Sequence, residues 1–101
     1  MDRANTFEGY QNLMGPTEHW PTELGPLYPI TGLAGEVGEV ANEIKKMHRD
    51  DGGILTPERK KKIVEELGDV LWYLTSLCNS LDICLEDIAY DSLDKVLNKR
   101  W

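Results

Sequence analysis

Two pairs of acidic residues, each with the spacing of one helical turn, stand on either side of a glycine-containing turn. Glu36 and Glu39 precede the run Asp51-Gly52-Gly53, and Glu66 and Asp69 follow it. Residues three apart lie on the same side of an α-helix. If the two segments fold back as an antiparallel hairpin, Glu39 lies level with Glu66, and Glu36 with Asp69. Four carboxylates in one small volume repel one another unless a cation is bound among them.

The kind of cation follows from the ligands. Mg²⁺ takes oxygen ligands and usually carries a phosphate substrate with it. We therefore expect metal-dependent phosphate chemistry, with Mg²⁺ as the cofactor and Mn²⁺ as a substitute. Both pairs border the apolar stripe of their helix, where metal ligands remain reachable from solvent. An isolated pair of this kind is common on solvated helices, so the prediction depends on two pairs in register.

The apolar pattern predicts an all-α fold, most simply a bundle of about four helices whose antiparallel central hairpin carries the acidic site. We expect helices over about 5–14, 30–48, 57–79 and 85–99. Four prolines and two glycines within 15–29 predict a loop or very short helix. The expected core stripes are Leu33, Val37, Val40, Ile44 and Met47; Ile63, Leu67, Val70, Leu74 and Leu77; and Ile88, Ala89 and Val96.

Length and charge bound the class of protein. The 101 residues form one domain, 1–101, with a core small enough that we expect a homo-oligomer. A net charge of −7 argues against nucleic acid or an anionic membrane as a partner. We see no signal peptide or membrane span, and Cys78 and Cys84 form no disulfide framework. These features favour a cytoplasmic protein.

Other features have structural as well as functional interpretations. Trp72 points away from the main stripe, and we expect it to contact another subunit. The basic run 59–62 is interpreted as a solvated face rather than a triphosphate site. His19 and His48 have no partner at metal-ligand spacing. The aromatic residues Tyr10, Trp20 and Trp101 either stack on a base or fill a core or interface.

The acidic motifs resemble those of a known family. The runs 32–40 (GLAGEVGEV) and 65–74 (EELGDVLWYL) are similar to the MazG-like nucleotide pyrophosphohydrolases. These belong to the all-α nucleoside triphosphate pyrophosphatase superfamily, which also holds the dimeric dUTPases. The family hallmark is E-x-x-E, a spacer, then E-x-x-D. Two positions depart from the pattern of many members: Gly35 replaces an acid, and Ser92 replaces an asparagine.

The resemblance implies hydrolysis of a (deoxy)nucleoside triphosphate between its α and β phosphates, giving a monophosphate and pyrophosphate. It implies a homo-oligomer, a dimer or a dimer of dimers, in the cytoplasm of a bacterial or phage-infected host cell. The residues to which it assigns roles fall into three groups: metal ligands Glu36, Glu39, Glu66 and Asp69; a water-activating glutamate, first Glu39 and alternatively Glu43 or Glu65; and phosphate contacts Lys45, Lys46, Lys95 and Arg100.

Two other functions remain as alternatives. A catalytically degenerate member of this fold would bind nucleotide or metal as a regulatory module, although it would have little reason to keep four acids. A purely structural helical oligomer with acidic faces would gain no stability from Mg²⁺, whereas a real metal site would.

Overall fold

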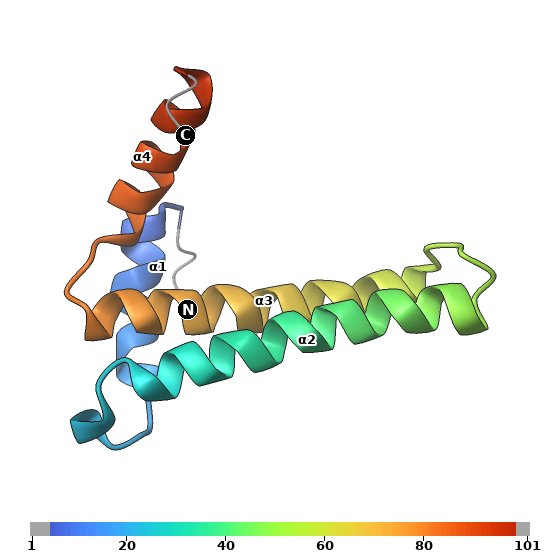
Figure 1. The fold of residues 1–101 in the computed structure, drawn as a ribbon, viewed down its shortest axis with the longest axis horizontal. Helices are drawn as coiled ribbons and strands as arrows, with labels where there is room; N and C mark the ends of the chain where they lie inside the picture. Colours follow the sequence, from blue (N-terminus) through green and yellow to red (C-terminus); the bar gives the residue numbers. More distant parts are fainter. Residues whose placement is uncertain (1–4, 99–101) are drawn as a thin grey trace.

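The described part of the chain forms four α-helices arranged around one long antiparallel hairpin (Figure 1). The computed structural model describes residues 5–98, except for the side chain of Thr22. The elements are α1 (Phe7–Met14), the short 3₁₀ helices η1 (Gly15–Thr17) and η2 (Thr22–Leu24), α2 (Leu27–Asp50), α3 (Pro57–Ser80) and α4 (Leu85–Leu97). The predicted all-α class and central hairpin are confirmed, and the proline-rich stretch forms very short helices as expected.

Local sequence signals set the helix ends. The hydroxyl of Thr56 accepts a hydrogen bond from the Arg59 amide at 3.1 Å, and Pro57 opens α3. Gly52 and Gly53 have φ of 66° and 78°, in the left-handed region that favours glycine, and they turn the chain between α2 and α3. The second helix begins three residues before the predicted Ile30, because Pro29 is tolerated within its first turn.

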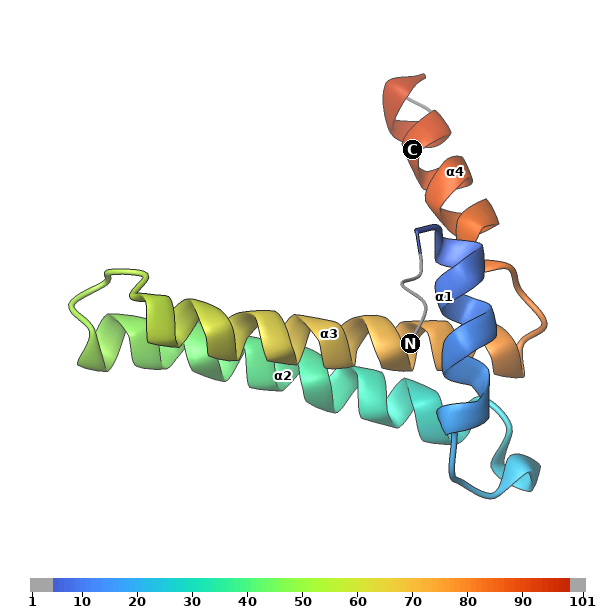
Figure 2. The ribbon, with the colours of Figure 1, turned by 180° about the vertical axis from the view of Figure 1, so that it is seen from behind.

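The hairpin, not a closed bundle, dominates the shape. In the reverse view, α1 crosses α3 near one end of the hairpin, and α4 extends away from it (Figure 2). The radius of gyration is 15.9 Å, against roughly 13 Å for a compact domain of this size. The buried apolar core lies where α1, α3 and α4 meet, at Met14, Cys78 and Leu85. The single chain therefore leaves much of the hairpin uncovered.

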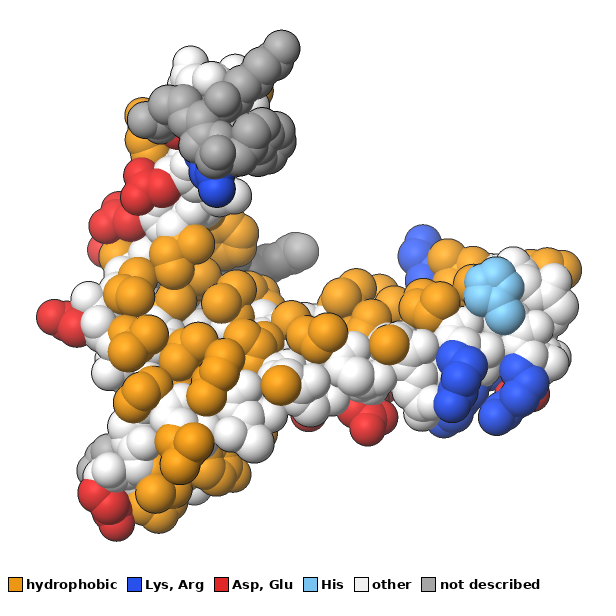
Figure 3. Space-filling view, in the orientation of Figure 1, with side chains coloured by type: hydrophobic (Ala, Val, Ile, Leu, Met, Phe, Trp, Pro, Cys, Tyr) orange, Lys and Arg blue, Asp and Glu red, His pale blue; other side chains and the backbone are white. Residues whose placement is uncertain are grey.

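The predicted core stripes are only partly buried. Val37 and Leu67 are 53% and 50% exposed, and Figure 3 shows hydrophobic side chains along one face of the molecule. We name the residues Ile30, Val37 and Ile44 of α2 with Val64 and Leu67 of α3 the exposed apolar stripe. The expectation that Ile88 and Val96 pack into the core was wrong, because α4 leaves the hairpin and exposes both side chains.

Candidate functional site

Three of the four predicted metal ligands meet where α2 and α3 pack together. Carboxylate oxygens of Glu36, Glu66 and Asp69 lie within 4.8 Å of one another. Glu36 comes from α2 and the other two from α3, so the antiparallel pairing of the helices creates the group. Glu36 and Glu66 are half-buried, and Asp69 is exposed. The group lies at the edge of the helix interface and opens to solvent, where the helical spacing predicts it.

Glu39 stands outside this group. Its side chain is exposed, although its negative charge still acts on Glu36 one turn away. Glu36 lies with both acids of α3, instead of the level pairs Glu39–Glu66 and Glu36–Asp69. The helices therefore bring three carboxylates together and leave the fourth free to reach toward a bound ligand.

The crowding of acids shows in the ionisation of Glu36. Partial burial raises its pKa above the usual 4.5, and a hydrogen bond with Glu66 raises it further, as do the charges of Asp69, Glu66 and Glu39. All of these causes disfavour the charged form of Glu36. A divalent cation bound among the acids would favour the charged form and offset the repulsion. Three oxygen donors on rigid helices suit Mg²⁺, which prefers such ligands.

An aromatic cluster lies beside the acids. Trp20 stacks on Tyr28 with ring centroids 5.0 Å apart, and it meets Trp72 edge to face at 5.5 Å. Trp72 also packs edge to face on Tyr73 and donates its indole hydrogen to the Thr17 hydroxyl at 2.9 Å. The contacts with Trp20 and Thr17 come from the segment before α2, yet Trp72 remains half-buried, and its contact with another subunit stays a prediction.

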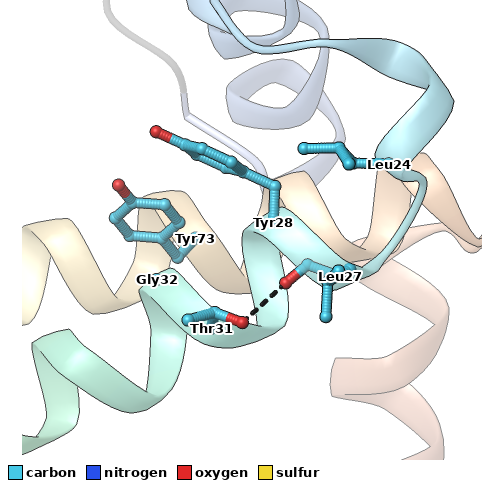
Figure 4. Close-up of a pocket in the computed structure, with 6 residues that line it drawn as sticks. All are labelled: Leu24, Leu27, Tyr28, Thr31, Gly32 and Tyr73. Carbon is cyan, nitrogen blue, oxygen red and sulfur yellow. Dashed lines mark hydrogen bonds between the residues drawn. The ribbon is translucent and has the colours of Figure 1, made fainter.

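A pocket of about 400 Å³ lies within this cluster (Figure 4). The rings of Tyr28 and Tyr73 direct their hydroxyl ends toward the same side of it. No charged side chain lines this pocket. Its lining residues are Leu24, Leu27, Tyr28, Thr31, Gly32 and Tyr73. Burial raises the pKa of Tyr73, with further contributions from Tyr28 and from the charges of Glu36 and Asp69, which places its phenol beside the acids.

Sequence reasoning missed this pocket, although a signal for it exists. Tyr28, Gly32 and Glu36 are spaced four apart on α2, and Asp69 and Tyr73 are four apart on α3. Residues with this spacing lie one above the other on a helix. The pocket residues therefore lie one turn from the acids on both helices. The spacing that identifies the acids extends to Tyr73 on α3 and back to Tyr28 on α2, but only the fold shows that both rings line one pocket.

Arg59, the first residue of the basic run in α3, forms ion pairs with acids of the hairpin. The Arg59 side chain is 11% exposed, and it donates to Asp51 at 2.8 Å and to Glu43 at 3.1 Å. The interpretation of Arg59 as part of a solvated face was wrong, because it ties α3 to α2 and to the turn between them. Glu43 is buried by this pairing and also lies 3.6 Å from Lys46.

The remaining predicted residues are dispersed. Glu65 and Lys45 are exposed on the hairpin outside the acidic group. Lys95 is exposed on α4, which packs against α1 and extends away from the hairpin. Arg100, like Trp101, lies outside the described residues. The chain by itself therefore gathers acids and aromatic residues but no cluster of phosphate-binding cations among residues 5–98.

Comparison with protein-family models identifies one family. Residues 26–100 match the family model of the MazG nucleotide pyrophosphohydrolase domain. The chain is 41% identical to the Gene 37 protein of Mycobacterium phage L5 over 76 residues, which cover 75% of this chain and 67% of that protein. It is 40% identical to the protein YpjD of Bacillus subtilis over 77 residues, covering 76% and 68% respectively. The B. subtilis protein YvdC is 32% identical over 85 residues, 79% of each chain. No solved structure gave a significant match.

Proposed function

The chain belongs to the MazG nucleotide pyrophosphohydrolase family, and from this premise we propose that it hydrolyses a (deoxy)nucleoside triphosphate in the presence of Mg²⁺. The bond cleaved is that between the α and β phosphates, and the products are the monophosphate and pyrophosphate. Such a reaction would remove or adjust one nucleotide in the cytoplasmic pool. None of the described helices is both long and apolar enough to cross a membrane.

The convergence of Glu36, Glu66 and Asp69 is the observation that carries this proposal. The neighbouring carboxylates disfavour the charged form of Glu36, as its raised pKa shows. If these acids had only a structural role, neutral side chains would be favoured in their place, because the repulsion would then be absent. A cation site needs the negative charges. Mg²⁺ bound to these acids would neutralise phosphate oxygens and the negative charge that develops on the pyrophosphate leaving group.

The acids divide the remaining work between them. We propose that Glu39 orients and deprotonates the attacking water. Its side chain is exposed, and it lies next to the three clustered acids without being one of them. Glu65 is the alternative, since it too is exposed on the hairpin. Glu43, also a sequence candidate, is buried and paired with Arg59. We therefore give Glu43 a role in holding the hairpin together.

The aromatic pocket supports a nucleotide as the substrate. Stacking of a nucleobase on an aromatic side chain contributes roughly 1–3 kcal/mol to binding, whichever base it is. Tyr28 and Tyr73 line a mostly apolar pocket one helical turn from Glu36 and Asp69. A nucleotide with its phosphates at the acids would place its base within reach of this pocket.

We further propose that the protein assembles as a homo-oligomer through the exposed apolar stripe. Its residues are between 38% and 58% exposed, on a chain whose buried apolar core is small. Soluble monomers rarely expose large contiguous apolar patches, and most soluble oligomers are symmetric dimers or multiples of them. A second copy is therefore the partner that this stripe suits.

Replacement of single acids tests the proposed site. We expect Glu36→Gln and Glu66→Gln to lower turnover by more than about a hundredfold. Mutation of a residue that only hydrogen-bonds to a metal ligand already lowers metal affinity or activity by about 10–100-fold. Circular dichroism should show an intact helical fold in both variants. Glu58→Gln, which removes an exposed acid at the start of α3, the helix that carries Glu66, should keep full activity. Turnover retained in both site variants would refute the assignment.

A further inference from the structure

Positive and negative charges are divided between the two ends of the hairpin. We name residues 45–62 the turn end, and residues 5–30 with 76–98, which include α1 and α4, the foot (Figure 1). The turn end carries seven lysine and arginine residues and three acids, whereas the foot carries eight acids and one lysine. In Figure 3, most of the blue side chains lie at the turn end, and red ones lie at the foot. A chain that is acidic as a whole therefore has one basic end.

Much of the basic charge at the turn end has no partner within the chain. Three of its cations pair with acids of the hairpin, namely Lys46, Arg49 and Arg59. At the foot, Asp87 and Asp91 of α4 are exposed and form no ion pair with another described residue. The other four cations of the turn end are exposed lysines that likewise form no ion pair among residues 5–98: Lys45, Lys60, Lys61 and Lys62.

Both ends also expose apolar side chains. Ile54 and Leu55 are exposed in the turn, and Leu81 and Ile83 are exposed between α3 and α4. The exposed apolar stripe runs along the hairpin between these two ends. Helices of 24 residues are about 36 Å long, so the turn end and the foot of one chain cannot meet. Their opposite charges are therefore available to another molecule.

We propose that two copies of this chain pair antiparallel across the exposed apolar stripe, with the turn end of each copy against the foot of the other. This inference rests on the homo-oligomer proposed above and not on the proposed reaction. A parallel pair would place two basic ends together and two acidic ends together, and like charges in contact oppose association. An antiparallel two-fold pair makes both complementary contacts at once, because each contact between the copies occurs twice.

The distance between two spin labels tests the orientation directly. The label is attached to Glu58→Cys at the turn end, in a chain whose exposed Cys84 is replaced by serine, while Cys78 is buried. In an antiparallel pair the two labels should lie about 30–40 Å apart, because the length of a 24-residue helix separates the two turn ends. A separation within about 20 Å, roughly two helix diameters, would show a parallel pair and overturn the proposal.

Removal of charge from the turn end tests the complementarity. The triple variant Lys60→Gln, Lys61→Gln and Lys62→Gln should raise the dissociation constant of the pair about tenfold at low salt, because three weak ion pairs are lost. The difference should shrink at high salt, which screens exposed charges. The control Lys95→Gln removes a lysine from the acidic foot and should not weaken pairing. Unchanged or tighter pairing in the triple variant would overturn the proposal, since a parallel pair would lose repulsion instead.

The oligomer and its orientation can fail separately. If analytical ultracentrifugation finds only monomers of the unsubstituted protein, this inference and the proposed homo-oligomer are both refuted. The proposed reaction is still decided by its products. If the protein pairs but the labels lie close together, the antiparallel arrangement is refuted and the homo-oligomer is retained.

Discussion

The ring of Tyr73 occupies the space that a side chain on Gly32 would need. A Cβ built at Gly32 would collide with three atoms of this ring. The absence of a side chain therefore lets α3 place an aromatic ring against α2, at the base of the pocket in Figure 4. A glycine in the middle of a helix costs roughly 0.5–1 kcal/mol relative to alanine. At this position the cost is offset by a close approach between the two helices.

Gly32→Ala should accordingly destabilise the protein. The new methyl group must displace the Tyr73 ring, and overpacking of this kind costs about 1–3 kcal/mol. The matched control is Gly35→Ala in the same helix, where a Cβ meets nothing within 4 Å. The control should gain about 0.5–1 kcal/mol from helix propensity. Urea denaturation of both variants measures the difference, and equal stabilisation would show that the ring is not confined.

The pH dependence of stability should reveal Glu36. Because its pKa is raised in the folded state, the folded metal-free protein keeps a proton that the unfolded chain releases. The contribution of Glu36 is then fully present below its usual pKa of 4.5 and is lost as the pH rises through its raised value. We expect the stability advantage of the metal-free protein over Glu36→Gln to shrink with rising pH across that window. Melting curves in EDTA test this, and an advantage that grows would contradict it.

Arg59 should be important for the stability of the far end of the hairpin. Arg59→Met would leave Glu43 buried without its partner on α3, and we expect a fall in Tm of about 5 °C or more. Arg49→Met is the control, since Arg49 is exposed and, among the residues that the structure describes, pairs only with its neighbour Asp50. Its Tm should stay within about 1 °C. Similar Tm values for the two variants would show that the Arg59 bridge does not stabilise the hairpin.

The exposed apolar stripe should control assembly. Light scattering coupled to size exclusion should find a dimer or larger oligomer of the unsubstituted protein. The double variant Ile44→Lys and Val64→Lys should be a monomer, because lysine pairs across the stripe would repel and be desolvated. Glu58→Lys adds a positive charge outside the stripe and should leave the oligomer intact. A monomeric unsubstituted protein at tens of micromolar would contradict the proposal.

The sequence predicted what depends on local pattern. Helical periodicity, the Thr56 cap and the glycine turn define the hairpin, and the three-residue spacing of the acids places them on one edge of it. The same logic failed for contacts that depend on distant segments. The contacts of Trp72 with Thr17 and Trp20 were not predicted, because these two residues come from an irregular segment with no periodicity to place them.

Charge patterns were similarly ambiguous without the fold. Arg59 stands first in a run of four cations, and nothing in that run distinguishes it from its solvated neighbours. Its partner Asp51 lies in the turn and Glu43 on the opposite helix, so only the closed hairpin identifies it. The exposed stripe shows the limit of periodicity: apolar spacing identifies a face that must be covered, but not whether the same chain covers it.

Product analysis tests the central claim most directly. Purified protein with Mg²⁺ would be incubated with each of the eight standard nucleoside triphosphates and dUTP, and the products separated by ion-exchange chromatography. Glu66→Gln would be run in parallel. The account predicts that one or a few nucleotides yield monophosphate and pyrophosphate, and that Glu66→Gln yields neither. Diphosphate with free phosphate would show that a different bond is cleaved, and no product from any nucleotide, with Mg²⁺ or Mn²⁺, would contradict the account.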